Sequence, residues 1–307
     1  MNHFIAITDH STDAIKHLLD VAFELRQQRE RGERNEPVLA GQTLAMIFEK
    51  PSLRTRVSFE QAMFELGGQA IVLDQQNVGL GQRESVADVT RVLTGMVQGI
   101  AARVFEHEKL EQMVAHSDKP VINMLSDYSH PCQALADVMT IMDTFGRDLK
   151  GRTLAFIGDG NNVARSLAAI CGRLGINFIV SSPAGYEIEQ AYVDRIMAQS
   201  PGMSFEMTRD PQQAVREADA IYTDTFVSMG QEQEKQIRLH AFADHQVNEA
   251  LLAAAPEHAI VLHCLPAYRG IEITDAVMDG PQCRAFPQAH NRLHAQKGLL
   301  AVLMGGR

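Results

Sequence analysis

The chain has 307 residues, which exceeds the size at which one hydrophobic core usually stops growing, so we expect two domains of about 150 residues each. Hydrophobic residues make up 45% of the chain and charged residues 21%, which excludes a disordered or fibrous protein. The net charge of -10 argues against nucleic acid or an anionic membrane as the main partner, because both are bound through an excess of Lys and Arg.

The four cysteines stand far apart and include no C-x-x-C pair, as expected for free thiols in a reducing compartment. The sequence has no signal-peptide pattern and no run of about 18 apolar residues. We therefore expect a cytoplasmic protein without a membrane segment. The cysteines are Cys132, Cys171, Cys264 and Cys283.

From Gly41 onward, short apolar runs alternate with segments of helical period, such as 59–66 and 163–174. This order predicts the α/β class, with two doubly wound domains, each with a mainly parallel sheet flanked by helices. Ligands of such sheets bind outside the carboxyl ends of the strands, and we expect the active site in the cleft between the domains. The predicted strands are 43–48, 70–73, 100–105, 120–125, 153–157, 177–180, 220–223 and 260–263.

A glycine-bounded, charged segment at 146–151 separates two such series and is the expected passage between domains. The predicted domains are therefore 1–146 and 147–288. The terminal segment 291–303 has a helical pattern. We expect the C-terminal helix, 289–307, to pack back on the first domain, although the sequence leaves packing on the second domain open.

The segment 48–60 runs from a strand through a proline turn into a helix whose N-cap would be Ser52. A helix start presents unpaired N–H groups and a partial positive charge, so hydroxyls and an arginine placed there form a site that suits phosphate. We expect Ser52, Arg54 and Thr55 to bind such a group. An isolated S-x-R-T motif is more often a capped helix with solvated arginines.

Arg103 stands near the end of one predicted strand, and His130 and Gln133 follow the end of another. An arginine and an imidazole aimed at one carbonyl oxygen stabilise the oxyanion that forms when a nucleophile attacks the carbonyl. Gln133 would accept a hydrogen bond from an adjacent NH₂ group. Each of these residues alone is more often structural, so the hypothesis depends on their combination.

The second domain opens with a G-x-G segment at 156–163 that superficially suggests a dinucleotide-binding fingerprint. We reject a nucleotide site, because Val163 occupies the third glycine position and the next strand ends without an acid for a ribose hydroxyl. A tight turn that presents Asn162 is the preferred interpretation.

Asp224 and Ser228 follow the end of one predicted strand, and Cys264 follows the end of another. An α-amino acid needs an acid for its ammonium group and donors for its carboxylate, so Asn162, Asp224 and Ser228 make a candidate amino-acid site. The alternatives are a loop cap for Asp224 and a small buried apolar role for Cys264, as for most lone cysteines.

Four motifs together resemble the signature set of the aspartate/ornithine carbamoyltransferase family, in the same order along nearly the whole chain. They are F-x-K-P-S-x-R-T-R at 48–56, H-P-C-Q at 130–133, D-x-x-x-S-M-G at 224–230 and H-C-L-P at 263–266. The first two are shared with the aspartate branch, whereas the last two and the segment 291–297 are similar to the ornithine branch.

The resemblance implies transfer of the carbamoyl group of carbamoyl phosphate to the δ-amine of L-ornithine, which gives L-citrulline and phosphate in arginine metabolism. It also implies no metal or organic cofactor, domain closure on ornithine, and a homotrimer or trimer-based assembly. The implied catalytic residues are Arg103, His130, Asp224 and Cys264, and those implied to bind ornithine are Asn162, Asp224, Ser228 and Met229. The implied carbamoyl phosphate site comprises Ser52, Leu53, Arg54, Thr55, Arg103, His130, Gln133, Cys264, Leu265 and Arg292.

Three positions depart from the family's pattern. Leu53 stands where threonine is usual, which removes a hydroxyl contact but keeps the backbone N–H. Phe226 stands where tryptophan is usual. The glutamine commonly donated by a neighbouring subunit falls on Gly79, and its candidate replacements are Gln76, Asn77 and Gln82.

The expected mechanism is direct attack of the neutral amine on the carbonyl through a tetrahedral intermediate. Alternative functions are a carbamoyltransferase for aspartate, putrescine or N-acetylornithine, an NAD-type dehydrogenase, and a non-catalytic binding protein on the same fold. An aspartate enzyme needs cations for a second carboxylate, and residues 225–229 carry none. The dehydrogenase is disfavoured by the defective fingerprint.

Overall fold

The computed structural model describes residues 1–228 and 230–307, and every side chain in these ranges except those of Gln76, Asn77 and Glu232. The chain forms two compact units. Unit 1 comprises Met1–Ala136 and His290–Arg307, and unit 2 comprises Asp137–Ala289. The chain leaves unit 1 within helix α6 (Pro131–Phe145) and re-enters it within helix α13 (Ala285–Leu303), while the glycine-bounded segment 146–151 lies within unit 2.

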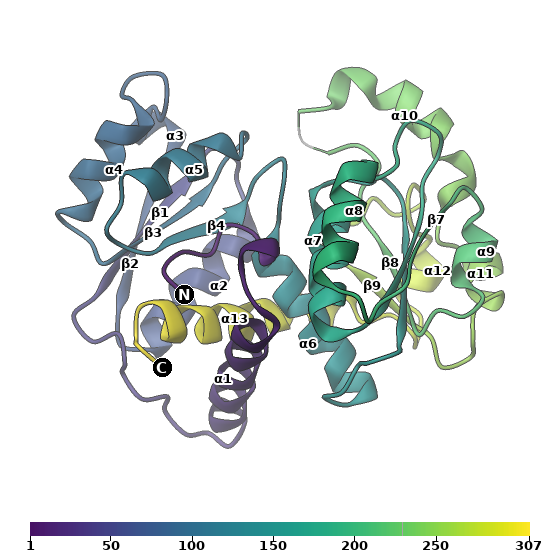
Figure 1. The fold of residues 1–307 in the computed structure, drawn as a ribbon, viewed down its shortest axis with the longest axis horizontal. Helices are drawn as coiled ribbons and strands as arrows, with labels where there is room; N and C mark the ends of the chain where they lie inside the picture. The colour runs from purple at the N-terminus through teal and green to yellow at the C-terminus, as the bar shows by residue number, and fades with distance from the viewer. Residues whose placement is uncertain (229) are drawn as a thin grey trace. The chain divides into compact units, whose positions relative to one another are not determined.

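Unit 1 is an open parallel sheet with strand order β2-β1-β3-β4. Figure 1 shows α4 and α5 over one face of this sheet and α2 and α13 over the other. The strands are β1 (Thr43–Phe48), β2 (Gln69–Asp74), β3 (Gly99–Arg103) and β4 (Val121–Leu125). The helices that lie wholly in unit 1 are η1 (Ile7–Asp9), α1 (Thr12–Glu30), α2 (Leu53–Glu65), α3 (Gln75–Val78), α4 (Val86–Thr94) and α5 (Glu108–Ala115).

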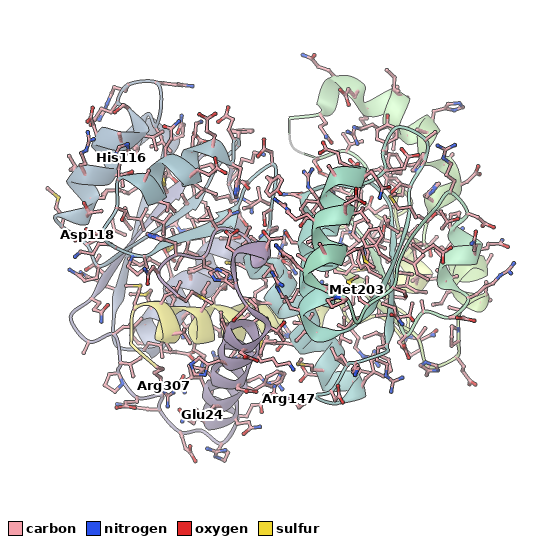
Figure 2. All side chains as sticks on the ribbon, viewed as in Figure 1. Glu24, His116, Asp118, Arg147, Met203 and Arg307 are labelled. Atoms are coloured by element: carbon pink, nitrogen blue, oxygen red, sulfur yellow. The ribbon has the colours of Figure 1, made fainter. Side chains whose placement is uncertain are left out.

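The core of unit 1 covers both faces of its central strands, which are therefore largely apolar. All six residues of β1 are buried, and a strand covered on both faces has a nearly continuous apolar sequence rather than an alternating one. On one face, Val89 of α4 and Leu110 of α5 pack in a single cluster with Ile100 of β3. At the end of the chain, an Arg307 Nη2 atom donates to Glu24 Oε1 of α1 at 2.9 Å (Figure 2).

Unit 2 is a second open parallel sheet, with strand order β7-β6-β5-β8-β9. Figure 1 shows α7 and α8 on one face of this sheet and α9, α11 and α12 on the other. The strands are β5 (Thr153–Ile157), β6 (Asn177–Ser181), β7 (Phe205–Thr208), β8 (Ala220–Thr223) and β9 (Ile260–His263). The helices are α7 (Asn162–Leu174), α8 (Gln190–Gln199), α9 (Pro211–Val215), η2 (Glu232–Glu234), α10 (Lys235–Ala241), η3 (Ala243–His245), α11 (Glu249–Ala253) and α12 (Asp275–Met278).

The predicted class, with two parallel sheets flanked by helices, is confirmed, and each predicted strand overlaps an observed one. Gly175 ends α7 in the left-handed conformation, with a φ of 71°, which glycine adopts without strain. Two elements were not predicted from the sequence: β7, an edge strand, and α1, which precedes the region of alternating runs. Among the described residues, no helix is both long and apolar enough to cross a bilayer.

The strand order of each sheet defines where a ligand would bind. The connections run in opposite directions from β1 and β3 in unit 1, and from β5 and β8 in unit 2, so each pair forms a topological switch point. At the carboxyl ends of these pairs, Phe48 is in register with Arg103, and Ile157 is in register with Thr223. Open α/β sheets bind ligands outside the strands at such points.

Candidate active site

The start of α2 in unit 1 has the expected N-cap. Ser52 Oγ accepts a hydrogen bond from the Thr55 backbone N–H at 3.3 Å, and its hydroxyl donates to Thr55 Oγ1 at 3.0 Å. Leu53, the first helical residue, has 75% of its surface exposed. The N–H groups of a first helical turn lack intrahelical partners, so this helix start is suited to an anion.

Arg103 ends β3 and is buried at the switch point of unit 1, with 7% of its surface exposed. The pairing of β3 with β4 shifts between Ala102 and Arg103, whereas its pairing with β1 stays regular up to Phe48. The Arg103 carbonyl also accepts a hydrogen bond from Glu49 N at 2.9 Å. Arg103 is therefore held beside the turn that leads from β1 into α2.

His130 is buried just before α6, and positive charge converges on it. Burial lowers the pKa of His130 well below its usual range, and three guanidinium groups lower this pKa further. The imidazole is therefore neutral at pH 7 and can donate one ring N–H to a carbonyl oxygen. Such a concentration of positive charge favours a bound anion. The guanidinium groups belong to Arg292, Arg103 and Arg54.

Arg292 of α13 contacts both the start of α2 and the start of α6. Its Nη1 atom donates to Gln133 Oε1 of α6 at 2.7 Å, and its Nη2 atom donates to Thr55 Oγ1 of α2 at 3.2 Å. Thr55, Gln133 and Arg292 each have 2% or less of their surface exposed. These three predicted site residues, widely separated in the sequence, form one buried polar group.

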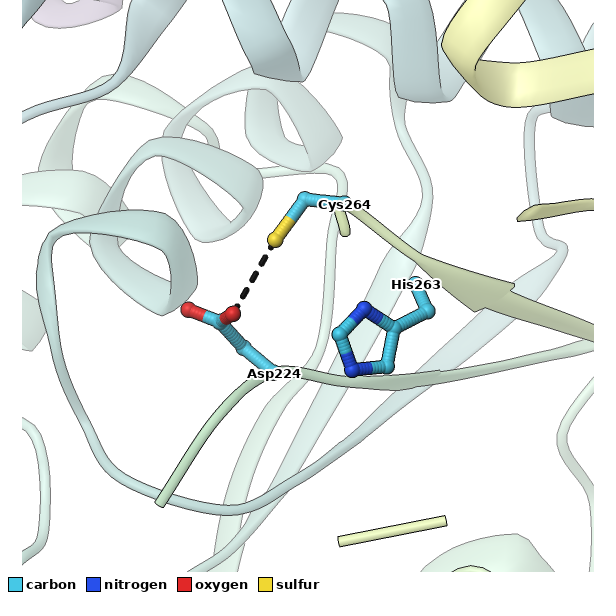
Figure 3. Close-up of side chains that lie close together, drawn as sticks. All are labelled: Asp224, His263 and Cys264. Atoms are coloured by element: carbon cyan, nitrogen blue, oxygen red, sulfur yellow. Dashed lines mark hydrogen bonds between the residues drawn. The ribbon is translucent and has the colours of Figure 1, made fainter. Parts of the chain in front are cut away.

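In unit 2, Asp224 and Cys264 meet where β8 and β9 end side by side. Thr223 and His263 are in register, so the residues that follow them emerge at the same edge of the sheet. The Cys264 thiol donates to Asp224 Oδ1, with 3.0 Å between sulfur and oxygen (Figure 3). Asp224 is thus joined directly to the H-C-L-P motif.

The Cys264 side chain is a thiol rather than a thiolate at neutral pH. Burial raises its pKa well above the usual range, and the negative charge of Asp224 raises this pKa further. A neutral thiol beside a carboxylate is a hydrogen-bond donor and a poor nucleophile. The geometry therefore suits orientation of a substrate group better than covalent catalysis by sulfur.

Asn161, which was not among the predicted site residues, is the residue before α7 that contacts Asp224. Its Oδ1 atom caps α7, and its Nδ2 atom donates to Asp224 Oδ2 at 3.2 Å. The signal available in the sequence was an asparagine directly before an amphipathic helix. Asn162 is the first residue of α7 and is partly buried.

The loop after β8 carries the remaining predicted contacts for an amino acid. Ser228 is partly buried, and its backbone N–H donates to Gln231 Oε1 at 2.9 Å. Met229 lies outside the described residues. Phe226 is 3% exposed and stacks on Phe242, with 4.7 Å between ring centroids, so an aromatic ring is retained where the family usually has tryptophan.

The G-x-G of unit 2 has a packing explanation. A Cβ atom on Gly160 would lie 2.5 Å from Ile188 N, so the adjacent backbone leaves no room for a side chain.

Gly79 of unit 1, at the position where the family commonly has a glutamine, is left-handed, with a φ of 61°, and ends α3. Of the three candidate replacements for the missing glutamine, Gln82 is exposed. The side chains of Gln76 and Asn77 lie outside the described part of the chain.

Asp224, His263 and Cys264 each offer one potential metal ligand, and these atoms lie within 4.8 Å of one another. However, both ring nitrogens of His263 have hydrogen-bond partners, since Nδ1 accepts from Leu265 N at 2.9 Å and Nε2 lies 3.1 Å from Glu272 Oε1. A metal ion would have to displace one of these contacts. The cluster is better described as a hydrogen-bonded group than as a metal centre.

The fold and these two groups of residues define a class, the two-domain α/β transferases. Within it, the model of the carbamoyl phosphate-binding domain of aspartate/ornithine carbamoyltransferases matches residues 2–143. The model of the aspartate/ornithine-binding domain of the same family matches residues 150–303. The chain belongs to the aspartate/ornithine carbamoyltransferase family.

Individual relatives align over nearly the whole chain. An ornithine carbamoyltransferase of Anoxybacillus flavithermus is 48% identical over 303 residues, which cover 98% of this chain and 96% of the relative. That of Bacillus subtilis is 49% identical, with 98% and 93% covered. The solved structure of the ornithine carbamoyltransferase from Pyrococcus furiosus is similar, with a TM-score of 0.96 at 44% identity, covering 100% of this chain and 98% of that one.

Proposed function

We propose that this protein transfers the carbamoyl group of carbamoyl phosphate to the δ-amine of L-ornithine, giving L-citrulline and phosphate, a step of arginine metabolism. The observation that carries the proposal is the convergence of three arginines on the buried, neutral His130 in unit 1. This combination suits a carbonyl attached to a phosphate, because cations bind the phosphate while a neutral imidazole polarises the carbonyl. The names of the relatives further support ornithine as the acceptor.

Unit 1 would bind carbamoyl phosphate. In this proposal the start of α2 holds the phosphate through Ser52, the Leu53 N–H, Arg54 and Thr55. Arg103 and His130 would contact the carbonyl oxygen, and Gln133, aligned by Arg292, would accept from the carbamoyl NH₂ group. We also assign Cys264 and Leu265 of unit 2 to the carbamoyl group. The proposed domains are 1–146 with the C-terminal helix 289–307, and 147–288.

Unit 2 would bind ornithine. Asp224 is the anionic group available for a substrate amine, and the Cys264 thiol is its hydrogen-bonded neighbour. Asn162, Ser228 and Met229 complete the proposed set, as the resemblance to the family implies. Since residues 225–229 carry no cation, the loop is poorly suited to the second carboxylate of aspartate.

The proposed reaction is direct attack of the neutral δ-amine on the carbonyl carbon, followed by collapse of the tetrahedral intermediate and departure of phosphate. An alkylamine with a pKa of about 10.4 costs about 4–5 kcal/mol to deprotonate at pH 7. Asp224 and Cys264 would orient the reactive amine, and the leaving phosphate can take its proton. Arg103 and His130 would each stabilise the oxyanion by about 3 kcal/mol.

A colorimetric assay for carbamoylated products tests this proposal. The purified protein would receive carbamoyl phosphate with ornithine and, in parallel, with aspartate, putrescine or N-acetylornithine. Product from ornithine alone is the expected result. Product from another amine only would retain the mechanism and overturn the assignment of the 224–230 loop, and the absence of any product would refute the carbamoyl phosphate site.

We further propose a homotrimer or a trimer-based assembly. Large apolar side chains are exposed on α2, on the edge strand β2, on α4 and just after α4, where contact with another copy would cover them. Light scattering should then give three times the chain mass of 33.9 kDa, and Phe64→Asp should lower it. A monomer at micromolar concentration would refute the assembly. The exposed residues are Val57, Phe64, Ile71, Val92 and Met96.

We also propose a cytoplasmic location. The four cysteines are free thiols, and cysteines of secreted proteins are more often paired in disulfides. Fractionation of cells that express the protein should recover its activity with cytoplasmic markers, and recovery with a membrane or secreted fraction would contradict the proposal.

A further inference from the structure

His263, the residue before Cys264, is a fully buried histidine whose two ring nitrogens have different partners. The Leu265 backbone N–H donates to Nδ1 at 2.9 Å. Because a backbone N–H can only donate, Nδ1 carries no proton, and the ring proton must reside on Nε2. Nε2 lies 3.1 Å from Glu272 Oε1 and therefore donates to it. The surroundings thus select a single tautomer of His263.

Glu272 is itself buried and hydrogen-bonded through both its side chain and its backbone. Both side chains of the pair have 0% of their surface exposed. Glu272 Oε1 also accepts from Tyr268 N at 2.5 Å, and the Glu272 carbonyl accepts from Val247 N at 2.9 Å. On the other side, the His263 backbone N–H donates to Gln288 Oε1 at 2.9 Å. Contacts to the His263 backbone and to its side chain therefore fix the orientation of the ring.

The contact with Leu265 N supports an unusual backbone conformation. Leu265 has a φ of 59°, and it is the one non-glycine residue among those described with a positive φ. A left-handed conformation is strained for an L-residue other than glycine, so surrounding contacts must maintain it. Nδ1 of His263 supplies such a contact, and Cys264, between the two residues, is fixed through its thiol to Asp224.

We propose that His263 and Glu272 form a positioning pair for carbamoyl transfer, in which Glu272 fixes the ring of His263 and Nδ1 holds the Cys264-Leu265 turn in its reactive geometry. This inference rests on the proposed function, which assigns Cys264 and Leu265 to the carbamoyl group. Neither His263 nor Glu272 touches the substrate in this assignment. Their effect on the reaction passes through the turn.

A role in stability alone leads to different expectations. Apolar residues of similar volume often replace a buried ionisable pair without loss of stability, because burial of charged groups has a large desolvation cost. If the pair only filled space, side-chain volume would determine the effect of a substitution. If it positions the turn, the location of the hydrogen-bond acceptor determines the effect.

Two matched pairs of variants separate these roles. Asparagine places its Oδ1 near the position of Nδ1, whereas the polar atoms of glutamine lie near the position of Nε2. We expect His263→Asn to keep kcat within about tenfold of the wild type, and His263→Gln to lower kcat by a further tenfold or more, roughly the effect of lost support for a site residue. Likewise, Glu272→Gln should retain kcat, whereas Glu272→Met should lower it.

The Michaelis constant gives a second readout. The KM for carbamoyl phosphate should change by less than about threefold in all four variants, because the proposed phosphate ligands belong to unit 1. His258→Gln is the control, since it removes another histidine–carboxylate contact of unit 2, at 3.0 Å to Asp219, and should leave kcat unchanged. Equal kcat values for His263→Asn and His263→Gln, or a parallel change in KM, would overturn the proposal.

The tautomer can also be tested in the wild-type protein, which covers the case that a variant does not fold. The ¹⁵N chemical shifts of the His263 ring should show a neutral imidazole with its proton on Nε2. A proton on Nδ1 would refute the inference. Citrulline formation by the wild type is measured first, because its absence would refute the proposed function itself, whereas normal formation with unchanged variants would refute the positioning pair alone.

Discussion

Arg292 donates a hydrogen bond of 2.7 Å to Gln133, although 159 residues separate them in the chain. Its other terminal nitrogen donates to Thr55 at the start of α2. A planar guanidinium can serve both acceptors at once, which a lysine ammonium on its flexible stem cannot do with the same geometry. The C-terminal helix thus completes the polar group that we assign to carbamoyl phosphate.

Arg292→Lys should therefore weaken carbamoyl phosphate binding while keeping the positive charge. We expect the KM for carbamoyl phosphate to rise at least about tenfold, because two buried acceptors lose their charge-assisted partner. Initial rates at varied carbamoyl phosphate and saturating ornithine give this number. Arg91→Lys, at an exposed position of α4, is the control and should behave as the wild type. A normal KM in Arg292→Lys would remove Arg292 from the site.

Arg103→Ala should lower turnover by at least about a hundredfold, the usual effect of removing one donor to an oxyanion. The reason is that Arg103 is the buried cation at the β1–β3 switch point, where the carbonyl oxygen is proposed to bind. Steady-state citrulline formation at saturating substrates is the measurement. Arg56→Ala, which removes a half-exposed arginine of α2, is the matched control. Near-normal turnover of Arg103→Ala would exclude the proposed role.

The central parallel strands were predictable because a strand that is buried on both faces has a run of adjacent apolar residues. Residues such as Met46 and Ile47 of β1 are adjacent, apolar and fully buried, so the strand is recognisable without its neighbours. Strand β7 has no such apolar run, because Glu206 and Met207 at its centre are exposed at the edge of the sheet. Edge strands depend on pairing with a distant segment, which a single sequence does not reveal.

The candidate site was predictable only where its residues follow strand ends or begin helices. Ser52 and Asp224 could be identified in that way. Glu272 and Gln288 could not, because each acts on His263 from a position set by tertiary packing. The place of Asn161 directly before an amphipathic helix indicated a cap, but its contact with Asp224 also depends on tertiary packing and could not be predicted.

Cys264 should react slowly with iodoacetamide in the folded protein. The thiolate is the reactive form, and burial together with Asp224 raises the thiol pKa, so less thiolate is present at pH 8 than in an unfolded peptide. We expect alkylation to be at least about tenfold slower than in urea-unfolded protein and still rising above pH 9. Asp224→Asn should speed it by removing a negative charge. Peptide mass spectrometry measures the rates, and a native rate equal to the unfolded one would contradict the prediction.

His294 should make the protein less stable in acid. Burial, followed by the positive charge of Lys297, lowers the pKa of His294 to about 3. Between about pH 6.5 and pH 3, His294 takes up a proton in the unfolded chain but not in the folded chain. The free energy of unfolding therefore falls as the pH decreases through this range. His294→Gln should reduce the loss between pH 6.5 and pH 4.5 by about 1–2 kcal/mol, measured by urea unfolding. His17→Gln, at an exposed site, should leave the loss unchanged. Identical pH dependence in His294→Gln and the wild type would show that the shift is absent.

Lys297 is a fully buried lysine that joins α13 to two other segments of unit 1. Its Nζ donates to Asn35 Oδ1 at 2.7 Å and to Glu65 Oε2 at 2.8 Å. Burial lowers the pKa of Lys297, and the contact with Glu65 opposes this effect. Removing one partner of a buried pair leaves the other without compensation, which is usually the larger part of the loss.

Lys297→Met should therefore lower the free energy of unfolding by about 3 kcal/mol, at the lower end for a broken buried pair because Arg29 still contacts Glu65. The double variant Glu65→Gln/Lys297→Met should lose less than the sum of the two single variants, since no unpaired carboxylate remains. Lys119→Met, which breaks an exposed contact with Asp118, is the control and should cost less than about 1 kcal/mol. Urea unfolding at pH 7 gives all four values. Additive losses would mean that Lys297 and Glu65 act independently. If Lys297→Met lowered the free energy of unfolding no more than the control does, the buried contact would not hold α13 in place.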